Sequence, residues 1–263
     1  ECINTVEAST KMDFKAGLEN EREVFVRLRD SDEGKSMRYM FFSEREAAKI
    51  PDIPKDTKTQ EIKKSAIIGS GTMGGGIAMN FANAGIPVVV VDVDKIALEA
   101  GLEKVRDNYA GSVSSGRITK ENMDNCLSLI TGTTNYKDIE DVDIVIEAVF
   151  EDMDLKKKIF AELDAVCKPE TILASNTSTL NINEIASATE RPDKICGTHF
   201  FSPANVMKLL ENVRTEKSSK ETLATIMGLA KIIGKTGVLV GIGDGFVGNR
   251  MLHISARIAE FMV

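Results

Sequence analysis

Apolar and polar positions follow two different patterns along this chain, and the pattern changes near residue 60. In residues 12–50, apolar side chains recur at helical spacing among alternating acids and bases, which predicts amphipathic helices. From residue 64 onward, short β-branched runs such as 65–69 and 87–94 alternate with longer amphipathic stretches. Continuous apolar strands separated by helices are typical of a parallel sheet covered on both faces, so we expect the α/β fold class.

Composition and charge narrow the function classes. The 263 residues are 43% hydrophobic and 28% charged, which suits a globular protein rather than a disordered one. The formal net charge of -7 argues against a nucleic-acid or anionic-membrane partner, and no apolar run reaches the ~20 residues of a membrane span. The four cysteines lack metal-site or disulfide spacing, so we expect no metal and a reducing, intracellular location. The first residue is Glu1 and the chain stops inside a predicted helix, so we expect both ends to be cut.

A glycine-rich stretch carries the first candidate site. Gly69, Gly71 and Gly74 fit the pattern G-x-G-x-x-G between a predicted strand and a predicted helix, and Asp92 ends the next strand about twenty residues later. Such a turn predicts dinucleotide binding: the first glycine permits the tight turn, the second lets a diphosphate approach, and the third lets the helix pack on the strand. Thr72 and Met73, inside the motif, belong to the predicted cofactor site. Asp92 would bind both ribose hydroxyls and repel a 2′-phosphate, which favours NAD over NADP.

One of the two histidines, His199, provides a candidate base. It lies at the end of a predicted strand, where open α/β sheets bind their ligands. Oxidation of an alcohol needs a group that accepts the hydroxyl proton, and imidazole suits this task near neutral pH. Glu211 on the following segment could orient the ring. From spacing alone, a structural histidine remains an equal alternative, and we take His253 as structural.

Five motifs in order resemble the 3-hydroxyacyl-CoA dehydrogenase family, in the form found in multifunctional β-oxidation enzymes. They are "GSGTMGGGIA", "VIEAVFEDMDLKKKIF", "ASNTSTL", "HFFSPANVMKLLE" and "GFVGNR". The resemblance covers nearly all of residues 62–263. It implies a Rossmann-type fold and NAD-dependent oxidation of (3S)-3-hydroxyacyl-CoA thioesters to 3-oxoacyl-CoA.

The resemblance also implies roles for individual residues. His199 falls on the family's general base and Glu211 on its orienting partner. Ser178 matches a serine that contacts the substrate oxygen, and Asn249 matches an asparagine that positions the reacting group. Glu151 and Lys156 match positions near the nicotinamide ribose. Without the resemblance, Ser178 and Asn249 would be read as capping residues, and a lysine-rich helix face as solvated.

We therefore divide the chain into a helical linker segment (1–60), an NAD-binding Rossmann-type domain (61–245) and the start of a truncated C-terminal helical domain (246–263). The resemblance implies a hydratase domain before the linker, as in the multifunctional members, and an all-helical domain that follows the NAD-binding domain, so we expect both in the full-length protein. We expect this chain alone to bind NAD but to turn over acyl-CoA poorly, because an uncovered site admits water. A homo-oligomer through uncovered surfaces is a further expectation. The family favours a peroxisomal location, and leaves a mitochondrial or bacterial cytoplasmic one open.

Two other functions compete with the dehydrogenase. A non-catalytic NAD-binding or structural protein, as in crystallin relatives, would have no need of the set formed by Ser178, His199, Glu211 and Asn249. A dehydrogenase of free 3-hydroxyacids would differ in not requiring the CoA moiety.

Overall fold

The computed structural model describes residues 1–262, and the chain forms two compact units, Glu1–Lys49 and Ile50–Val263. The second unit begins before the predicted linker ends, because residues 50–63 attach to its core. Ile53 is buried there, the Gln60 N–H donates to the Thr225 hydroxyl at 3.0 Å, and Arg214 pairs with Asp52 at 2.8 Å.

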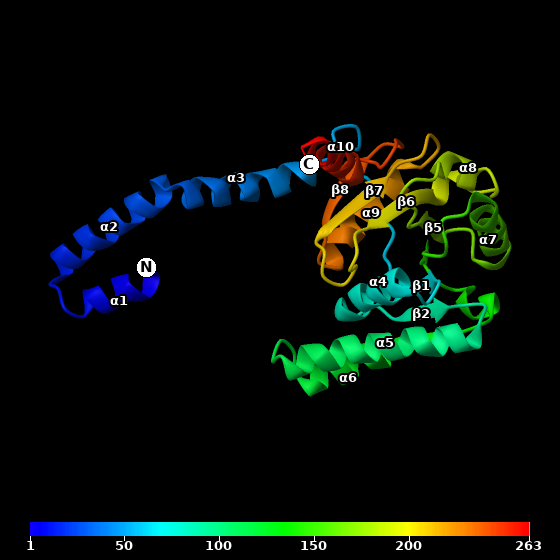
Figure 1. The fold of residues 1–263 in the computed structure, drawn as a ribbon, viewed down its shortest axis with the longest axis horizontal. Helices are drawn as coiled ribbons and strands as arrows, with labels where there is room; N and C mark the ends of the chain where they lie inside the picture. The colour runs from blue at the N-terminus through cyan, green and yellow to red at the C-terminus, as the bar shows by residue number, and fades with distance from the viewer. Residues whose placement is uncertain (263) are drawn as a thin grey trace. The chain divides into compact units, whose positions relative to one another are not determined.

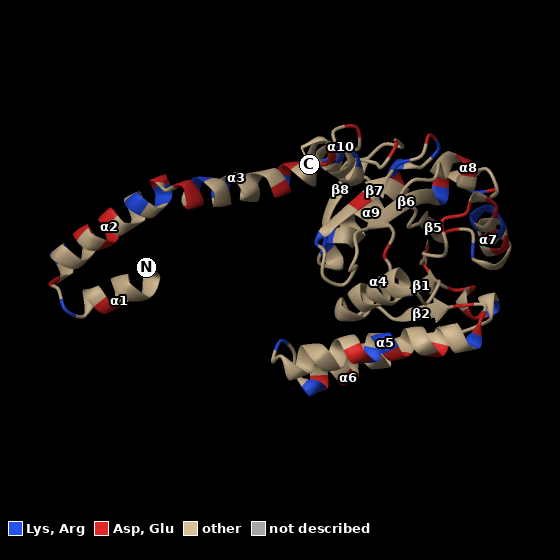
Figure 2. Cartoon of the chain, in the orientation of Figure 1, with Lys and Arg blue, Asp and Glu red and all other residues tan. Residues whose placement is uncertain are grey.

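The first unit consists of three helices, α1 (Cys2–Ser9), α2 (Phe14–Asp30) and α3 (Asp32–Ala47). Asp13 caps the N-terminus of α2 and Ser31 that of α3, each through a side-chain oxygen that accepts a backbone N–H. No residue of these helices is buried, and charges of both signs alternate along α2 and α3 (Figure 2). This unit therefore has no apolar core of its own.

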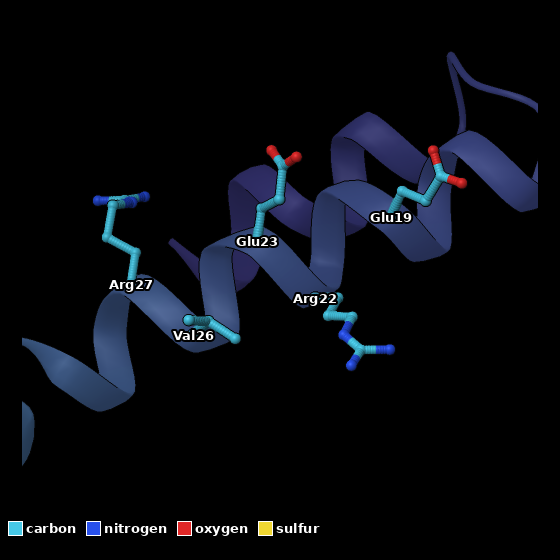
Figure 3. Close-up of a pocket in the computed structure, with 5 residues that line it drawn as sticks. All are labelled: Glu19, Arg22, Glu23, Val26 and Arg27. Carbon is cyan, nitrogen blue, oxygen red and sulfur yellow. The ribbon is translucent and has the colours of Figure 1, made fainter.

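A hollow of about 490 Å³ lies on α2 (Figure 3). Its lining residues all come from this one helix and are Glu19, Arg22, Glu23, Val26 and Arg27. Because no second element contributes a side chain, the hollow offers no group of converging polar atoms. It is not a candidate site.

The second unit is built on one sheet of eight strands in the order β3-β2-β1-β4-β5-β6-β7-β8 (Figure 1). The strands are β1 (Ser65–Ile68), β2 (Val88–Val91), β3 (Ile130–Thr133), β4 (Ile144–Glu147), β5 (Ile172–Ser175), β6 (Ile195–Phe200), β7 (Leu209–Val213) and β8 (Thr236–Val240). All neighbours pair in parallel except β6 and β7, which are antiparallel. The predicted fold class, a mostly parallel Rossmann-type sheet, is confirmed.

Helices cover both faces of this sheet. They are α4 (Thr72–Asn83), α5 (Lys95–Ser114), α6 (Lys120–Ser128), α7 (Met153–Val166), α8 (Ile182–Ala186) and α9 (Lys220–Ile232), with 3₁₀ turns η1 (Tyr136–Ile139) and η2 (Pro192–Lys194). Helix α10 (Gly248–Phe261) follows β8 and has no buried residue. Strand residues alternate between two apolar clusters: Ile67 packs with α4, α5 and α9, whereas Ala66 and Ile68 pack with α7 and α8. Asp94 and Asp152 cap α5 and α7.

Three elements are missing from the sequence-based prediction: β3, α6 and β7. β7 matters most for function, because it carries Glu211, the partner of His199. The sequence pattern placed Glu211 only on a segment that follows His199. The second strand also ends at Val91, so Asp92 follows the strand rather than ending it. In the described part of the chain, no helix is both long enough and apolar enough to span a membrane.

Candidate functional site

The glycine turn joins β1 to α4 at the carboxyl edge of the sheet. Gly69 has a φ of +100°, and a β-carbon there would lie 2.8 Å from the carbonyl oxygen of Ala148. A β-carbon on Gly74 would overlap the carbonyl oxygen of Gly69, whereas one on Gly71 would have no neighbour within 4 Å. Two glycines are therefore required by local packing, and Gly71 leaves space open in front of the helix.

That space is a cavity of about 760 Å³. The strand order reverses beside β1, because β2 lies on one side of it and β4 on the other, and such switch points are where doubly wound sheets bind ligands. Helix α4 begins at the cavity with no side-chain cap, so its first N–H groups are available to an anion. The predicted cofactor residues that line the cavity are Gly69, Gly71, Thr72, Met73 and Asp92.

Other lining residues escaped the sequence analysis. They include Val93, Lys104, Tyr136 and Phe150. Phe150 and Val93 are strongly exposed apolar side chains at its wall. Phe150 follows β4, the strand beside β1, and this position was the sequence feature that could have predicted its place at the cavity.

Asp92 is held as a hydrogen-bond acceptor at this cavity. Its Oδ2 accepts from the Ser70 N–H at 2.9 Å and from the Ser70 hydroxyl at 2.6 Å. Burial acts to raise the pKa of Asp92, but the hydrogen bonds from Ser70, together with those from the Asp94 and Val93 N–H groups, hold the pKa below its ordinary value. The carboxylate is therefore ionised at neutral pH, as recognition of ribose hydroxyls requires. The cavity, the glycine turn and this acid fit a dinucleotide.

His199 and Glu211 form a buried pair on the antiparallel strands. His199 Nδ1 lies 2.8 Å from Glu211 Oε2, and both side chains are at most 4% exposed. The rings of Phe201 and Phe246 lie beside the imidazole, with centroids 4.5 and 5.5 Å away. Since the carboxylate accepts from Nδ1, the other ring nitrogen, Nε2, is left to exchange a proton with a ligand.

The other oxygen of Glu211 receives the start of α10. Its Oε1 accepts the N–H of Val247 at 3.0 Å and that of Gly248 at 2.8 Å. Burial acts to raise the pKa of Glu211, but hydrogen bonds from His199 and these two N–H groups hold the pKa below its ordinary value. An ionised Glu211 can therefore stabilise an imidazolium. Asn249 follows Gly248 directly, so Glu211 fixes where the half-buried Asn249 lies.

Ser178 lies in the turn after β5, the parallel neighbour of β6. The Ser178 N–H donates to Glu151 Oε1 at 2.8 Å, and Asn176 Oδ1 accepts the Phe200 N–H at 2.8 Å. The turn is thus tied to the strand that carries His199. Within residues 1–262, the side chains of Ser178 and Asn249 form no hydrogen bond with His199 or Glu211.

Glu151 and Lys156, which the resemblance placed near the nicotinamide ribose, are not among the lining residues of the 760 Å³ cavity. Glu151 binds the turn that contains Ser178, and Lys156 is buried at 1% exposure with its ammonium 2.6 Å from Glu147 Oε1. Glu147, at the end of β4, is a residue that sequence reasoning missed. A glutamate closing an apolar strand was the only available signal.

The connection between β6 and β7 has its own support. The carbonyl oxygen of Ala204 accepts from Lys235 Nζ at 2.6 Å and from Asn80 Nδ2 at 3.0 Å, and Lys235 also donates to Met207 O at 2.8 Å. Burial lowers the pKa of Lys235. These contacts link the connection after His199 to α4 and to the start of β8.

Comparisons with known proteins cover most of the chain. Residues 64–245 match the family model described as 3-hydroxyacyl-CoA dehydrogenase, NAD binding domain. The chain is 44% identical, over its whole length, to the peroxisomal bifunctional enzyme of Cavia porcellus, and spans only 36% of that protein.

Two solved structures extend the comparison. (S)-3-Hydroxybutyryl-CoA dehydrogenase PaaH1 from Ralstonia eutropha matches with a TM-score of 0.72 at 38% identity, over 73% of this chain and 68% of that one. The dehydrogenase part of multifunctional enzyme 1 from C. elegans matches with a TM-score of 0.70 at 31% identity, over 82% of this chain and 52% of that one.

Proposed function

The chain belongs to the 3-hydroxyacyl-CoA dehydrogenase family and carries its NAD-binding domain, and from this premise we propose that it oxidises (3S)-3-hydroxyacyl-CoA thioesters to 3-oxoacyl-CoA. The observation that carries the proposal is the buried pair of His199 and Glu211, at 2.8 Å. The pair lies in the same sheet as the glycine turn, where it can serve a substrate placed against the cofactor.

The proposed chemistry assigns one task to each residue. His199 accepts the proton of the 3-hydroxyl group, and Glu211 orients the ring and stabilises the imidazolium. Ser178 and Asn249 donate to the 3-oxygen, and such preorganised donors contribute ~3 kcal/mol each in the transition state. With NAD held at the cavity by Gly71, Thr72 and Asp92, its nicotinamide would supply the acceptor for the hydride that leaves C3.

The cofactor site is proposed to use five residues of the cavity wall. The backbone at Gly71, Thr72 and Met73 faces the diphosphate at the start of α4, while Gly69 shapes the turn and Asp92 accepts from the ribose hydroxyls. Gly74 supports the site from behind through its close packing on Gly69.

The test uses the reverse reaction at high protein concentration, so that slow turnover is still measured. We expect NADH consumption with acetoacetyl-CoA, none with free acetoacetate, and loss of the reaction in His199→Gln. Turnover of the free acid would favour a dehydrogenase of free 3-hydroxyacids. NAD binding without any turnover would favour the non-catalytic alternative.

We also propose that this chain is part of a longer peroxisomal protein. The Cavia porcellus relative is named peroxisomal and bifunctional, and the chain spans 36% of it. The apolar side chains exposed on α10, namely Met251, Leu252, Ile254 and Ile258, are consistent with a covering helical domain. Sedimentation of this chain alone would measure its association, and imaging of the full-length protein would test its location.

A further inference from the structure

A buried ion pair that the proposed chemistry does not use joins the end of β4 to helix α7. Glu147 is fully buried at the end of β4, and Lys156 is 1% exposed, with Nζ 2.6 Å from Glu147 Oε1. Burying two charges is costly unless their remaining hydrogen-bonding capacity is satisfied. The next residue, Lys157, has a side chain 34% exposed on the same helix.

The Glu147 carboxylate is satisfied on both oxygens. Its Oε1 also accepts the Val149 N–H at 2.8 Å, and its Oε2 accepts the Ser175 hydroxyl at 2.7 Å. Ser175 is the last residue of β5 and pairs with Glu147 across the parallel ladder. Glu147 therefore fixes the point where the chain leaves β5.

Lys156 links Glu147 to a second carboxylate. Its Nζ lies 3.5 Å from Glu151 Oε2. The other oxygen of Glu151 accepts the Thr177 hydroxyl at 2.6 Å, the Ser178 N–H at 2.8 Å and the Thr179 N–H at 3.1 Å. The turn is thus bound at its first residue by Glu147 and at its last three by Glu151, with one ammonium between the carboxylates.

This turn also contacts the strand of the candidate base, since Asn176 Oδ1 accepts the Phe200 N–H at 2.8 Å. We propose that Glu147 and Lys156 are positioning residues that hold the Ser175–Thr179 turn, and with it Ser178, at the reacting end of the site. The proposal rests on the proposed function for the role of Ser178. It assigns Lys156 a role at the turn that does not depend on the cofactor.

The main test is the double variant Glu147→Gln with Lys156→Met. It removes both charges of the pair, so that neither residue is left as a buried charge without its partner. Amide hydrogen exchange is followed at Ser178 and Thr179. We expect exchange there to accelerate about tenfold, as for loss of one charge-assisted hydrogen bond. Exchange in β2 should not change, and Lys157→Met on the same helix serves as the matched control.

Activity readouts then separate positioning from cofactor contact. For the double variant we expect a lower kcat with a KM for NADH close to the parent value. The single variant Lys156→Arg, which keeps the positive charge, should have a kcat between those of the double variant and the parent. Unchanged exchange at Ser178 together with weakened NAD binding would overturn the proposal, because Lys156 would then act on the cofactor directly.

A third variant covers the case in which the double variant does not fold. Glu151→Gln alters a side chain that is 38% exposed, and it weakens the same acceptor of the Ser178 and Thr179 N–H groups. Faster exchange at both amides supports the proposal, and no change overturns it. Since exchange does not require turnover, an inactive chain would contradict the proposed function and leave this test standing.

Discussion

His199 and Glu211 are direct partners in the antiparallel ladder of β6 and β7, and their side chains meet on one face of the sheet at 2.8 Å. The same carboxylate accepts the first N–H groups of α10. One residue therefore orients the imidazole and positions the helix that carries Asn249.

Replacing this carboxylate should impair catalysis more than folding. In Glu211→Gln the amide still accepts a hydrogen bond but carries no charge to stabilise an imidazolium, so we expect kcat to fall by about 100-fold or more. Initial rates of NADH consumption with acetoacetyl-CoA measure this. Glu190→Gln, an exposed acid elsewhere, should retain the parent rate; equal rates for Glu211→Gln and the parent would refute the role of the carboxylate.

The same residue predicts how stability depends on pH. The pKa of Glu211 is held below its ordinary value of 4.5, so the folded state binds fewer protons than the unfolded chain between the two values. This stabilisation is complete above the ordinary pKa and is lost as the pH falls through the folded-state pKa. Urea unfolding from about pH 7 to about pH 3 should therefore show a smaller acid-induced loss in Glu211→Gln than in the parent.

Two glycines of the motif should respond differently to the same added methyl group. In Gly74→Ala the β-carbon overlaps the carbonyl oxygen of Gly69, so we expect a loss of about 1–3 kcal/mol in the free energy of unfolding. In Gly71→Ala the β-carbon meets no protein atom within 4 Å, so stability should persist while NAD binding weakens. Calorimetric titration and thermal melts distinguish the two; full NAD affinity in Gly71→Ala would contradict the placement of the diphosphate.

Asp92 should set the choice of cofactor. Removal of a charged acceptor of ribose hydroxyls should weaken NAD binding about tenfold or more, and it should relieve the repulsion of a 2′-phosphate. We expect Asp92→Ala to lose the preference for NAD over NADP in parallel titrations. Ser70→Ala, which removes only one hydrogen bond to the carboxylate, should retain part of it. A preference unchanged in Asp92→Ala would mean that another residue selects the cofactor.

The sequence predicted those parts of the fold that depend on local pattern. The run 65–69, the glycines and the acid after the second strand predict β1, the turn and α4. This prediction succeeds because it depends only on the spacing of residues that are close in sequence. β7 escaped because "LLENV" places Glu211 and Asn212 in the middle of a short strand, which strand propensity disfavours. Glu211 is tolerated there because His199 on β6 and the Val247 and Gly248 N–H groups at the start of α10 donate to it. The Asn212 amide nitrogen contacts Met227 on α9, whereas Asn212 Oδ1 has no hydrogen-bond partner among the described residues.

The charged network was beyond sequence reasoning for a different reason. The sequence "LKKKIF" contains three successive lysines that local pattern does not distinguish. In the folded chain Lys156 is buried, whereas Lys157 is partly exposed. Burial of a charge is set by partners distant in sequence, here Glu147 and the turn after β5. The resemblance named Glu151 and Lys156, and the structure supplies the contacts that relate them.

The antiparallel pairing of β6 and β7 sets how this region can vary in length. Residues 201–208 connect the two strands, and an insertion there lengthens a loop without altering which residues pair. An insertion within Leu209–Val213 would shift part of the ladder by one position, so that the residues on the two sides of the insertion could no longer both keep their partners on β6. Homologous enzymes should therefore tolerate a change of length in this loop, away from Phe201 and from the Ala204 and Met207 carbonyls that Lys235 binds, more readily than within the two strands.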